Sequence, residues 1–297
     1  MISLIICSRN ALISASLVEN LEKTVGLPYE TITIDNSTNQ YSIFQAYNIG
    51  ASQAQYECLC FMHEDILFHT VGWGKIVIEE LNDPHTGVIG VAGAIYKSEI
   101  ESSWWMSNEE DFSFYHRYNL LQHFKSGIKK LEAKGGEKDS DSASVVVLDG
   151  VWMCCRKQFW ECHPFDEKTF NGFHFYDLDF SLTAFVNGFA NKVTYRVLLE
   201  HFSAGQMDKS WIIDSKRFHS KWEKKLPLST QPVSAEESEK IKKGIIRNYL
   251  QTLHGNQQLA FGNWLKYWWK GFSMAPFNRD HFTLAWAFVK RRIKSIG

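Results

Sequence analysis

The stretch "LCFMHEDILF", residues 59–68, joins an apolar run directly to three ionisable side chains. Its first four residues are apolar and few enough to form a buried strand. His63, Glu64 and Asp65 follow at once, and the chain then becomes apolar again. Because such side chains are costly to bury without partners, we expect a strand that carries a polar site at its carboxyl end.

The segments around this stretch alternate between strand-like and helix-like patterns. Such alternation is typical of a parallel sheet covered by helices. Ligands of these sheets bind beyond the carboxyl ends of the strands, so we expect Asp35 and residues 63–65 at the mouth of the sheet. The predicted strands cover residues 3–7, 31–34, 57–62 and 87–93, and the predicted helices cover residues 10–26, with Asn10 as cap and Gly26 as stop, 41–55 and 71–81.

The middle of the chain is less regular. The aromatic segment 101–119 is expected to form a long loop or hairpin, and the polar, Gly/Ser-rich segment 132–144 is expected to be mobile. Strands are predicted over residues 144–150, which end in Asp149 and Gly150, and over 192–199, just before His201; a helix is predicted over residues 175–188.

Charge divides the chain unevenly. Residues 241–297 hold ten Lys/Arg and one acid, whereas the preceding residues hold 22 Lys/Arg and 32 Asp/Glu, although the whole chain nets −1. We predict a domain over 1–205, with a nucleotide-binding half (1–100) and an acceptor half (101–205), and a helical, basic and aromatic extension over 206–297. A basic tail behind an acidic body indicates an anionic partner for the tail.

The aromatic residues of this tail lie among basic ones, a pattern of segments that bind a membrane interface. A helical cap packed on the domain, with a solvated basic face, is the alternative. We expect peripheral membrane contact and no nucleic-acid partner. The aromatic residues are Trp264, Trp268, Trp269, Phe272 and Trp286, and the basic ones are Lys266, Lys270, Lys290, Arg291 and Arg292.

Six cysteines are read as reduced thiols of a cytoplasmic protein. Arg9 interrupts the first apolar run, so no signal peptide is expected, and no run approaches the roughly 18 apolar residues of a membrane span. Two sets of residues, neither with a C-x2-C spacing, leave a zinc site open beside the interpretation as buried free cysteines. They are Cys58, Cys60 and His63, and Cys154, Cys155, Cys162 and His163.

Known glycine motifs for phosphate binding are absent from the sequence: neither G-x-G-x-x-G nor G-x-x-x-x-G-K-[ST] occurs, and there is no G-x-S-x-G. What remains is a set of acids and histidines near strand ends. Oxygen and nitrogen ligands of this kind suit Mg²⁺ or Mn²⁺, which neutralise a diphosphate, while a separate carboxylate deprotonates a hydroxyl. These residues therefore indicate transfer of a nucleotide-activated group. They are Asp35, His63, Glu64, Asp65, Asp149, Asp177, Asp179 and His201.

The order of motifs resembles glycosyltransferase family 2, inverting nucleotide-sugar transferases with a GT-A fold. The motifs are "SLIICSRN", "TITIDNST", "FMHEDI", "LDGVWMCCRK", "FYDLDFSL" and "LLEHFSAG", within residues 1–205. The resemblance implies an α/β fold with a Rossmann-like, mixed and mainly parallel sheet flanked by helices. It also implies a UDP- or GDP-sugar donor, a glycan or lipid-linked acceptor, and a divalent cation, Mn²⁺ or Mg²⁺.

The resemblance also implies roles for individual residues. Asp177 matches the catalytic base. Asp35, with Arg9 after the first strand and Asp65, is expected to bind the nucleotide. The metal ligands are expected to be His63, Asp65 and His201, and the sugar or acceptor pocket is expected to include Asp149, Gly150, Asp179 and Trp104.

Two positions depart from the family pattern: His63 replaces the first acid of Asp-x-Asp, and Tyr176 replaces the Glu that usually precedes the base. Structural alternatives stay open: Asp35 could form an Asx turn, and Asp177 could cap its helix and leave Asp179 as the base. A catalytically silent sugar- or nucleotide-binding relative and a nucleotidyltransferase are the alternative functions.

Overall fold

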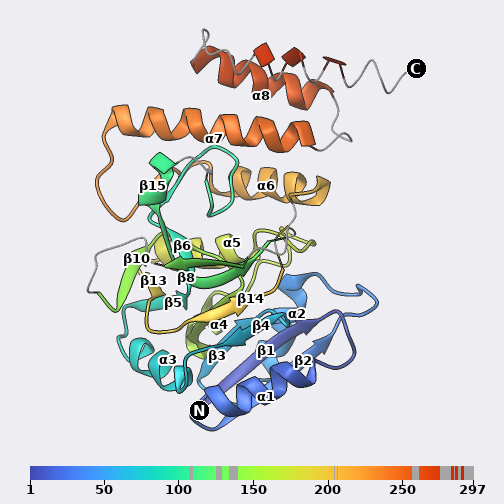
Figure 1. The fold of residues 1–297 in the computed structure, drawn as a ribbon, viewed down its shortest axis with the longest axis vertical. Coiled ribbons are helices and arrows are strands. Elements are labelled where there is room, and N and C mark those ends of the chain that lie inside the picture. The colour runs from blue at the N-terminus through green and yellow to red at the C-terminus, as the bar shows by residue number, and fades with distance from the viewer. Residues whose placement is uncertain are drawn as a thin grey trace.

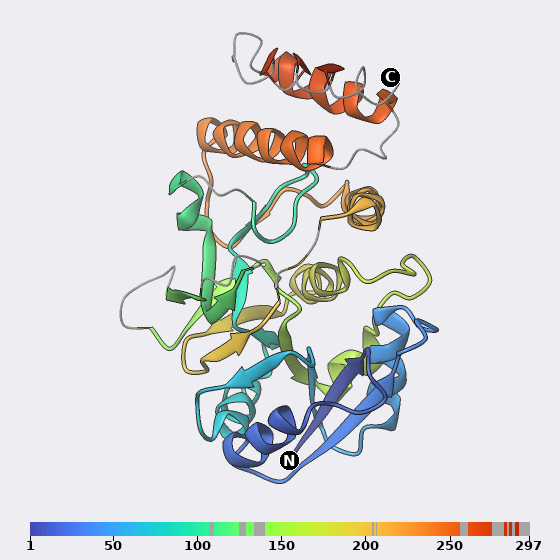
Figure 2. The same cartoon turned by 45° about the vertical axis from the view of Figure 1, so that its right-hand side comes forward.

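The computed structural model describes residues 1–106, 110–124, 129–133, 140–203, 205, 207–255, 261–274, 282–283, 285–286 and 289–290. Strands and their covering helices form one end of the molecule, and three helices are stacked on the other end (Figures 1 and 2). These three are α6 (Lys209–Trp222), α7 (Ala235–Gly255) and α8 (Phe261–Met274).

The large sheet has the order β10-β13-β5-β12-β3-β1-β2. Strands β2, β1, β3, β5 and β13 run in one direction, while β12 and β10 run antiparallel to their neighbours. The prediction of a mixed, mainly parallel sheet is therefore confirmed. The bounds are β1 Ile2–Ser8, β2 Tyr29–Asp35, β3 Cys58–Met62, β5 Thr86–Gly90, β10 Ser142–Val145, β12 Trp152–Arg156 and β13 Ala190–Thr194.

A second sheet, of order β11-β6-β8-β14-β4 with β9 beside β8, lies next to the first, and β15 pairs with β7. Its strands are β4 Ile66–Phe68, β6 Ala92–Ala94, β8 His116–His123, β9 Lys129–Ala133, β11 Val147–Leu148 and β14 Leu199–His201, with β7 Tyr96–Lys97 and β15 Leu228–Ser229 in the pair. The remaining helices are α1 Ala15–Thr24, α2 Ile43–Gln53, α3 Trp73–Leu81, α4 Lys157–Cys162, α5 Tyr176–Val186 and the 3₁₀ helix η1 Glu110–Tyr115.

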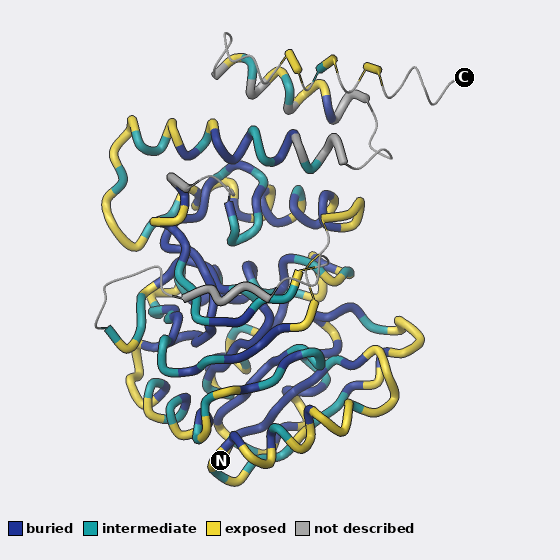
Figure 3. Tube along the Cα trace, in the orientation of Figure 1, coloured by how far each residue is buried: buried dark blue, intermediate teal, exposed yellow. Residues whose placement is uncertain are grey.

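Both faces of the large sheet are buried, which explains the uninterrupted apolar runs of β1 and β3. Along β1, Ile5 packs on the cluster that contains Phe44 of α2, whereas Leu4 and Ile6 pack on the cluster that contains Trp73 of α3. The buried strands form the centre of the lower part in Figure 3. The first cluster continues into α6, α7 and Trp264 of α8, so the C-terminal helices share its apolar packing; the division at residue 205 stays a prediction.

Four predicted elements were wrong in their bounds. The predicted strand 87–93 is divided between β5 of the large sheet and β6 of the second sheet. The predicted strand 144–150 is divided between β10, which pairs with β13, and β11, which pairs with β6 in the other sheet. The predicted strand 192–199 is likewise divided between β13 and β14. Helix α1 begins after Ser14, whose hydroxyl accepts from the Leu17 N–H, and not after Asn10; Gly26, at φ +75°, follows its end as predicted.

The aromatic segment 101–119 is a loop up to residue 106 and, after residues 107–109, which lie outside the described part, continues as η1 and the start of β8. Residues 134–139 of the segment that was expected to be mobile also lie outside the described part. Among the described helices, none combines the length and the apolar character that a membrane crossing requires.

Candidate functional site

Strand ends bring the predicted site residues to one edge of the large sheet. β1 and β2 are in register to their last residues, Ser8 beside Asp35, and Met62 at the end of β3 lies beside Ile6. Trp152, which opens the antiparallel β12, pairs with Met62, so residues 149–151 arrive at the same edge. The expected gathering of polar residues at the mouth of the sheet is confirmed.

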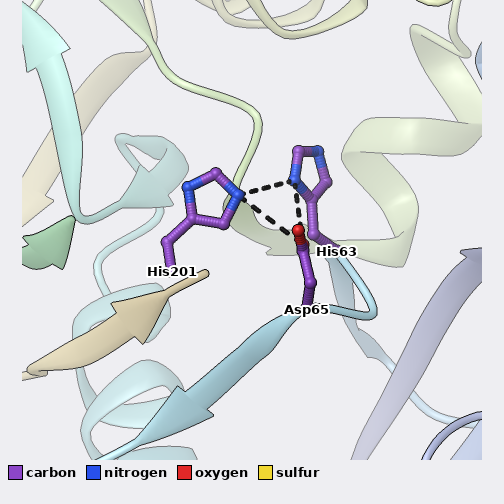
Figure 4. A group of neighbouring side chains, drawn as sticks. All are labelled: His63, Asp65 and His201. Atoms are coloured by element: carbon purple, nitrogen blue, oxygen red, sulfur yellow. Dashed lines mark hydrogen bonds and ion pairs between the residues drawn. The ribbon is translucent and has the colours of Figure 1, made fainter. Parts of the chain in front are cut away.

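His63, Asp65 and His201 form a compact cluster (Figure 4). His63 follows β3, Asp65 precedes β4, and His201 ends β14, which pairs with β4. His63 Nδ1 lies 3.4 Å from His201 Nε2, and Asp65 Oδ1 lies 3.8 Å and 3.6 Å from these two nitrogens. Ligands about 2.0–2.2 Å from a divalent ion lie a few ångströms from one another, so the cluster fits a cation.

The ionisation of this cluster also suits a cation. Burial, followed by the neighbouring His201, lowers the pKa of His63. Burial acts to raise the pKa of Asp65, but His201, Ser203 and His63 outweigh it and hold that pKa well below its usual range. A neutral imidazole and an ionised carboxylate are the forms that bind a metal.

Asp177 lies at the start of α5, directly beside the segment that precedes β12. Its Oδ2 accepts from the Gly150 N–H at 2.9 Å and its Oδ1 from the Leu178 N–H at 2.9 Å. Burial, and then the charge of Asp149, raises the pKa of Asp177 to about 7. The N-cap position is taken by Phe175, at φ 66°, so the interpretation of Asp177 as the cap was wrong.

Tyr176 and Gln122 were not predicted, yet both contact the histidines. The Tyr176 hydroxyl lies 2.8 Å from His63 Nε2 and donates to the Gly150 carbonyl at 3.0 Å. Gln122 Oε1 lies 3.0 Å from His201 Nδ1. The departure from the family pattern at position 176 could have identified Tyr176 as a site residue. Gln122 belongs to no motif, so the sequence held no signal for it.

Asp149 is tied to its surroundings. Its Oδ1 accepts from the Val151 N–H at 2.9 Å, and its Oδ2 accepts from the indole N–H of Trp104. Both residues are half-buried, and Trp104 lies edge-on to Trp105 with 5.4 Å between ring centroids. The contact of Trp104 and Asp149 with a sugar stays a prediction, as does the pocket role of Gly150.

Asp179 is 2% exposed and points toward α6. Its carboxylate accepts from Lys221 Nζ at 2.8 Å and from Trp222 Nε1 at 2.8 Å. Lys221 also binds Asp166 at 2.8 Å. These bonds join α5 to α6, which is a structural role; the predicted place of Asp179 in the acceptor pocket stays a prediction.

Asp35 and Arg9 are exposed at the same edge. Asp35 Oδ1 accepts from the Ser37 N–H at 2.9 Å, so the Asx turn that was left open is present. Glu64 is held by the Ser8 hydroxyl and by the Arg9 N–H at 3.1 Å, and so secures the end of β1. Nucleotide binding by Asp35 and Arg9 stays a prediction.

The cysteines of the zinc alternatives are not clustered as ligands. Cys58, Cys60, Cys154 and Cys155 are buried, and Cys162 is exposed. Burial is the largest cause of the raised thiol pKa of Cys58, Cys154 and Cys155. Among the residues that the structure describes, the metal-ligating side chains that lie close enough to share an ion are His63, Asp65 and His201, and no set of cysteines does so.

Three solved structures show a distant likeness to this chain. GalNAc-T7 with UDP, GalNAc and Mn²⁺ is 11% identical, with a TM-score of 0.46 over 68% of this chain, which spans 43% of that one. A197 from STIV is 14% identical, with a TM-score of 0.39 over 68% of this chain and 85% of that one. TarS 1–349 from S. aureus is 12% identical, with a TM-score of 0.47 over 92% of this chain and 79% of that one.

A comparison with curated proteins found no match. The model of a family described as "Glycosyltransferase like family", however, matches residues 3–227. This match covers most of the chain and includes the whole edge that carries His63, Asp65, Asp177 and His201. The chain therefore belongs to the Glycosyltransferase like family.

Proposed function

We propose that this protein transfers a sugar from a UDP- or GDP-sugar to a hydroxyl of a glycan or lipid-linked acceptor, with inversion. The observation that carries the proposal is the edge of the large sheet, where a His-Asp-His cluster lies beside a carboxyl group of raised pKa. The His-Asp-His cluster is suited to bind the leaving diphosphate through a cation, and the carboxyl group of raised pKa is suited to deprotonate the incoming hydroxyl. Family membership supports glycosyl transfer.

On the donor side, His63, Asp65 and His201 would hold a divalent cation, Mn²⁺ or Mg²⁺. When bound, the cation supplies positive charge that neutralises the diphosphate. Two imidazoles and one carboxylate favour Mn²⁺ over Mg²⁺, which prefers oxygen ligands. Asp35 and Arg9, exposed at the same edge, contact the nucleotide.

On the acceptor side, Asp177 takes the proton of the attacking hydroxyl. A general base works best when its pKa lies near the operating pH, and burial together with Asp149 places the pKa of Asp177 at about 7. Backbone N–H groups of Gly150 and Leu178 hold the carboxylate in place. Direct attack by the deprotonated hydroxyl on the anomeric carbon inverts its configuration.

The two alternative functions differ from this proposal in their products. A catalytically silent relative would bind a nucleotide sugar without releasing UDP or GDP, and a nucleotidyltransferase would release inorganic diphosphate. The geometry of His63 argues against a catalytically silent relative, since its Nδ1 faces Asp65 and His201 as the Nδ1 of a metal ligand would. The segment after β1 contains Arg9 but no glycine, unlike the Gly-rich loop of a nucleotidyltransferase.

We expect a nucleotide sugar to raise the melting temperature of the full chain, and to raise it more when Mn²⁺ is present. A ligand at 100 times its Kd, bound only to the folded state, stabilises by about 2.7 kcal/mol, enough to shift the Tm by several degrees. UDP- and GDP-sugars are screened with Mn²⁺ and with a chelator, and release of UDP or GDP is then measured with candidate acceptors. A chain that melts unchanged with every nucleotide sugar contradicts the proposal.

The C-terminal helices suit contact with an anionic membrane surface. Trp264 is buried against the protein, whereas Trp269 is 61% and Trp286 70% exposed. Lys266 and Lys290 are exposed in the same segments. Exposed indoles next to lysines match an interfacial segment, and such contact would bring the enzyme to a lipid-linked acceptor.

Exchanging Trp269 and Trp286 together for Ser is expected to weaken binding to vesicles that contain phosphatidylserine by at least about tenfold. A buried large apolar side chain contributes about 1.5–3 kcal/mol, and about 1.4 kcal/mol is a factor of ten. Sedimentation with vesicles at low salt measures the binding, and high salt should also weaken it. Phe114→Ser is the control, since Phe114 is a similarly exposed aromatic residue on η1. If the wild type, the double Trp variant and Phe114→Ser bind vesicles equally, membrane contact is contradicted and the C-terminal helices are a structural cap.

A further inference from the structure

The orientation of His63 is set by Tyr176. A phenol has one proton, and Tyr176 donates it to the Gly150 carbonyl at 3.0 Å. Its oxygen can therefore only accept in the 2.8 Å contact with His63 Nε2. The proton of the neutral His63 ring lies on Nε2, and its lone pair lies on Nδ1, the atom that faces Asp65 and His201.

Gln122 sets the second histidine in the same way. Its amide nitrogen donates to the carbonyls of Ser203 at 2.6 Å and His123 at 2.8 Å. The amide oxygen is thereby turned toward His201 Nδ1, 3.0 Å away, and must accept from it. The lone pair of His201 then lies on Nε2, which faces His63 and Asp65.

These two assignments leave two nitrogen lone pairs facing one another. The nitrogens are 3.4 Å apart, and when both rings are neutral in these tautomers neither nitrogen carries a proton. The distances of 3.6 Å and 3.8 Å to Asp65 are too long for hydrogen bonds that would explain the arrangement. The Ser203 hydroxyl lies 3.4 Å from His201 Nε2 and can donate its one proton there, but a cation among the two nitrogens and the Asp65 oxygen would satisfy all three at once. Histidine ligands are usually fixed through their other ring nitrogen.

We infer that Tyr176 and Gln122 are positioning residues, which hold the two histidines in the tautomers and orientations that ligate the cation. This inference rests on the proposed function, because it takes the cluster to be the metal site. It also gives a reason for glycine at position 150. A Cβ there would collide with the Tyr176 phenol, which has to approach closely in order to reach the carbonyl.

The Gly150 residue also connects the two sides of the site. Its carbonyl accepts from Tyr176, which orients the ligand His63, and its N–H donates to Asp177, the proposed base. Tyr176, which stands where the family has a Glu before the base, therefore has a role in this site. It links His63, which stands where the family has an Asp, to the backbone of Gly150 on the acceptor side.

The test is the affinity of the full chain for Mn²⁺ without nucleotide, measured from the electron paramagnetic resonance signal of free Mn²⁺. Loss of a residue that orients a ligand typically costs about 10–100-fold in metal affinity, and we expect this loss in Tyr176→Phe, which keeps the ring. Tyr115→Phe is the matched control, since it also loses a bonded hydroxyl, to Glu237, but away from the cluster. Gln122→Met is expected to lower the Mn²⁺ affinity in the same way, because it removes the acceptor of His201. This variant tests the inference if Tyr176→Phe does not fold.

A second readout needs no metal. Ring ¹⁵N shifts of the apo protein at about pH 8, where a histidine of ordinary pKa is neutral, should show His63 with its proton on Nε2. In Tyr176→Phe the two tautomers should mix, a change that a purely structural role would not produce. A folded Tyr176→Phe that binds Mn²⁺ within about threefold of wild type overturns the inference. Wild-type protein that binds no Mn²⁺ but still releases UDP or GDP overturns it too, and leaves the proposed glycosyl transfer standing.

Discussion

Replacement of Asp177 by Asn is expected to lower turnover by about 10²–10⁴-fold, the usual contribution of a general base, with nucleotide-sugar binding nearly unchanged. The amide keeps the shape of the side chain and one accepting oxygen, so one of the bonds from Gly150 and Leu178 survives. It has no site of comparable basicity, so the acceptor hydroxyl keeps its proton. The measurement pairs kcat with the Kd of the donor, because a loss confined to the transition state lowers kcat alone.

The matched control is Asp179→Asn, two residues further along the same helix. Asp179 is buried and paired with Lys221, so this exchange removes a buried charge partner. We expect a lower Tm, with turnover of the folded fraction retained. If instead Asp177→Asn stays within a few-fold of wild type while Asp179→Asn loses activity, Asp177 is a structural residue and the base is Asp179.

The pH dependence of turnover gives an independent check on the same residue. A base must be deprotonated, and the raised pKa of Asp177, about 7, means that activity is lost as the pH falls through neutrality. Asp149→Asn removes the neighbouring negative charge that contributes to this shift. The acidic limb of the profile should therefore move to lower pH in that variant, and a limb that does not move contradicts the assignment.

Asp65→Ala is expected to remove the part of the donor affinity that depends on Mn²⁺, a loss of at least about 100-fold in metal affinity. Residues that merely orient a ligand account for roughly 10–100-fold, and Asp65 is the one anionic ligand of the cluster. Titration calorimetry with UDP and GDP, with and without Mn²⁺, measures the effect. Asp65→Ala is thus expected to weaken binding of the donor diphosphate in the ground state. Asp177→Asn is expected to lower kcat, because it removes an interaction made in the transition state.

Glu64→Gln is the neighbouring control for this exchange. Glu64 accepts from the Ser8 hydroxyl and the Arg9 N–H and so serves the end of β1. We expect its variant to bind Mn²⁺ as the wild type does. If Asp65→Ala keeps the full Mn²⁺ effect, or if both exchanges remove it equally, the cluster is not the metal site.

Most of the edge could be predicted from the sequence because it depends on local patterns. Apolar runs buried on both faces identify β1 and β3, and the direction of parallel strands carries Asp35 and His63 to one edge. Where a strand changed sheets, local pattern was not enough. Val145 and Val147 look like one strand, but they pair with different partners, Asn191 and Ala94.

The type of fold, the polar edge of the sheet and the kinds of side chain available there thus follow from residue patterns along the chain. Which of these side chains meet depends on contacts between segments that are far apart in the sequence. His63 and His201 are 138 residues apart and come together because β14 pairs with β4. Gln122 reaches His201 because β8 pairs with β14, and Asp179 is drawn to α6 by Lys221. Hydrophobic periodicity records how each segment is buried, but pairing between distant strands is selected by the packing of the whole chain, and that packing sets the chemistry of the site.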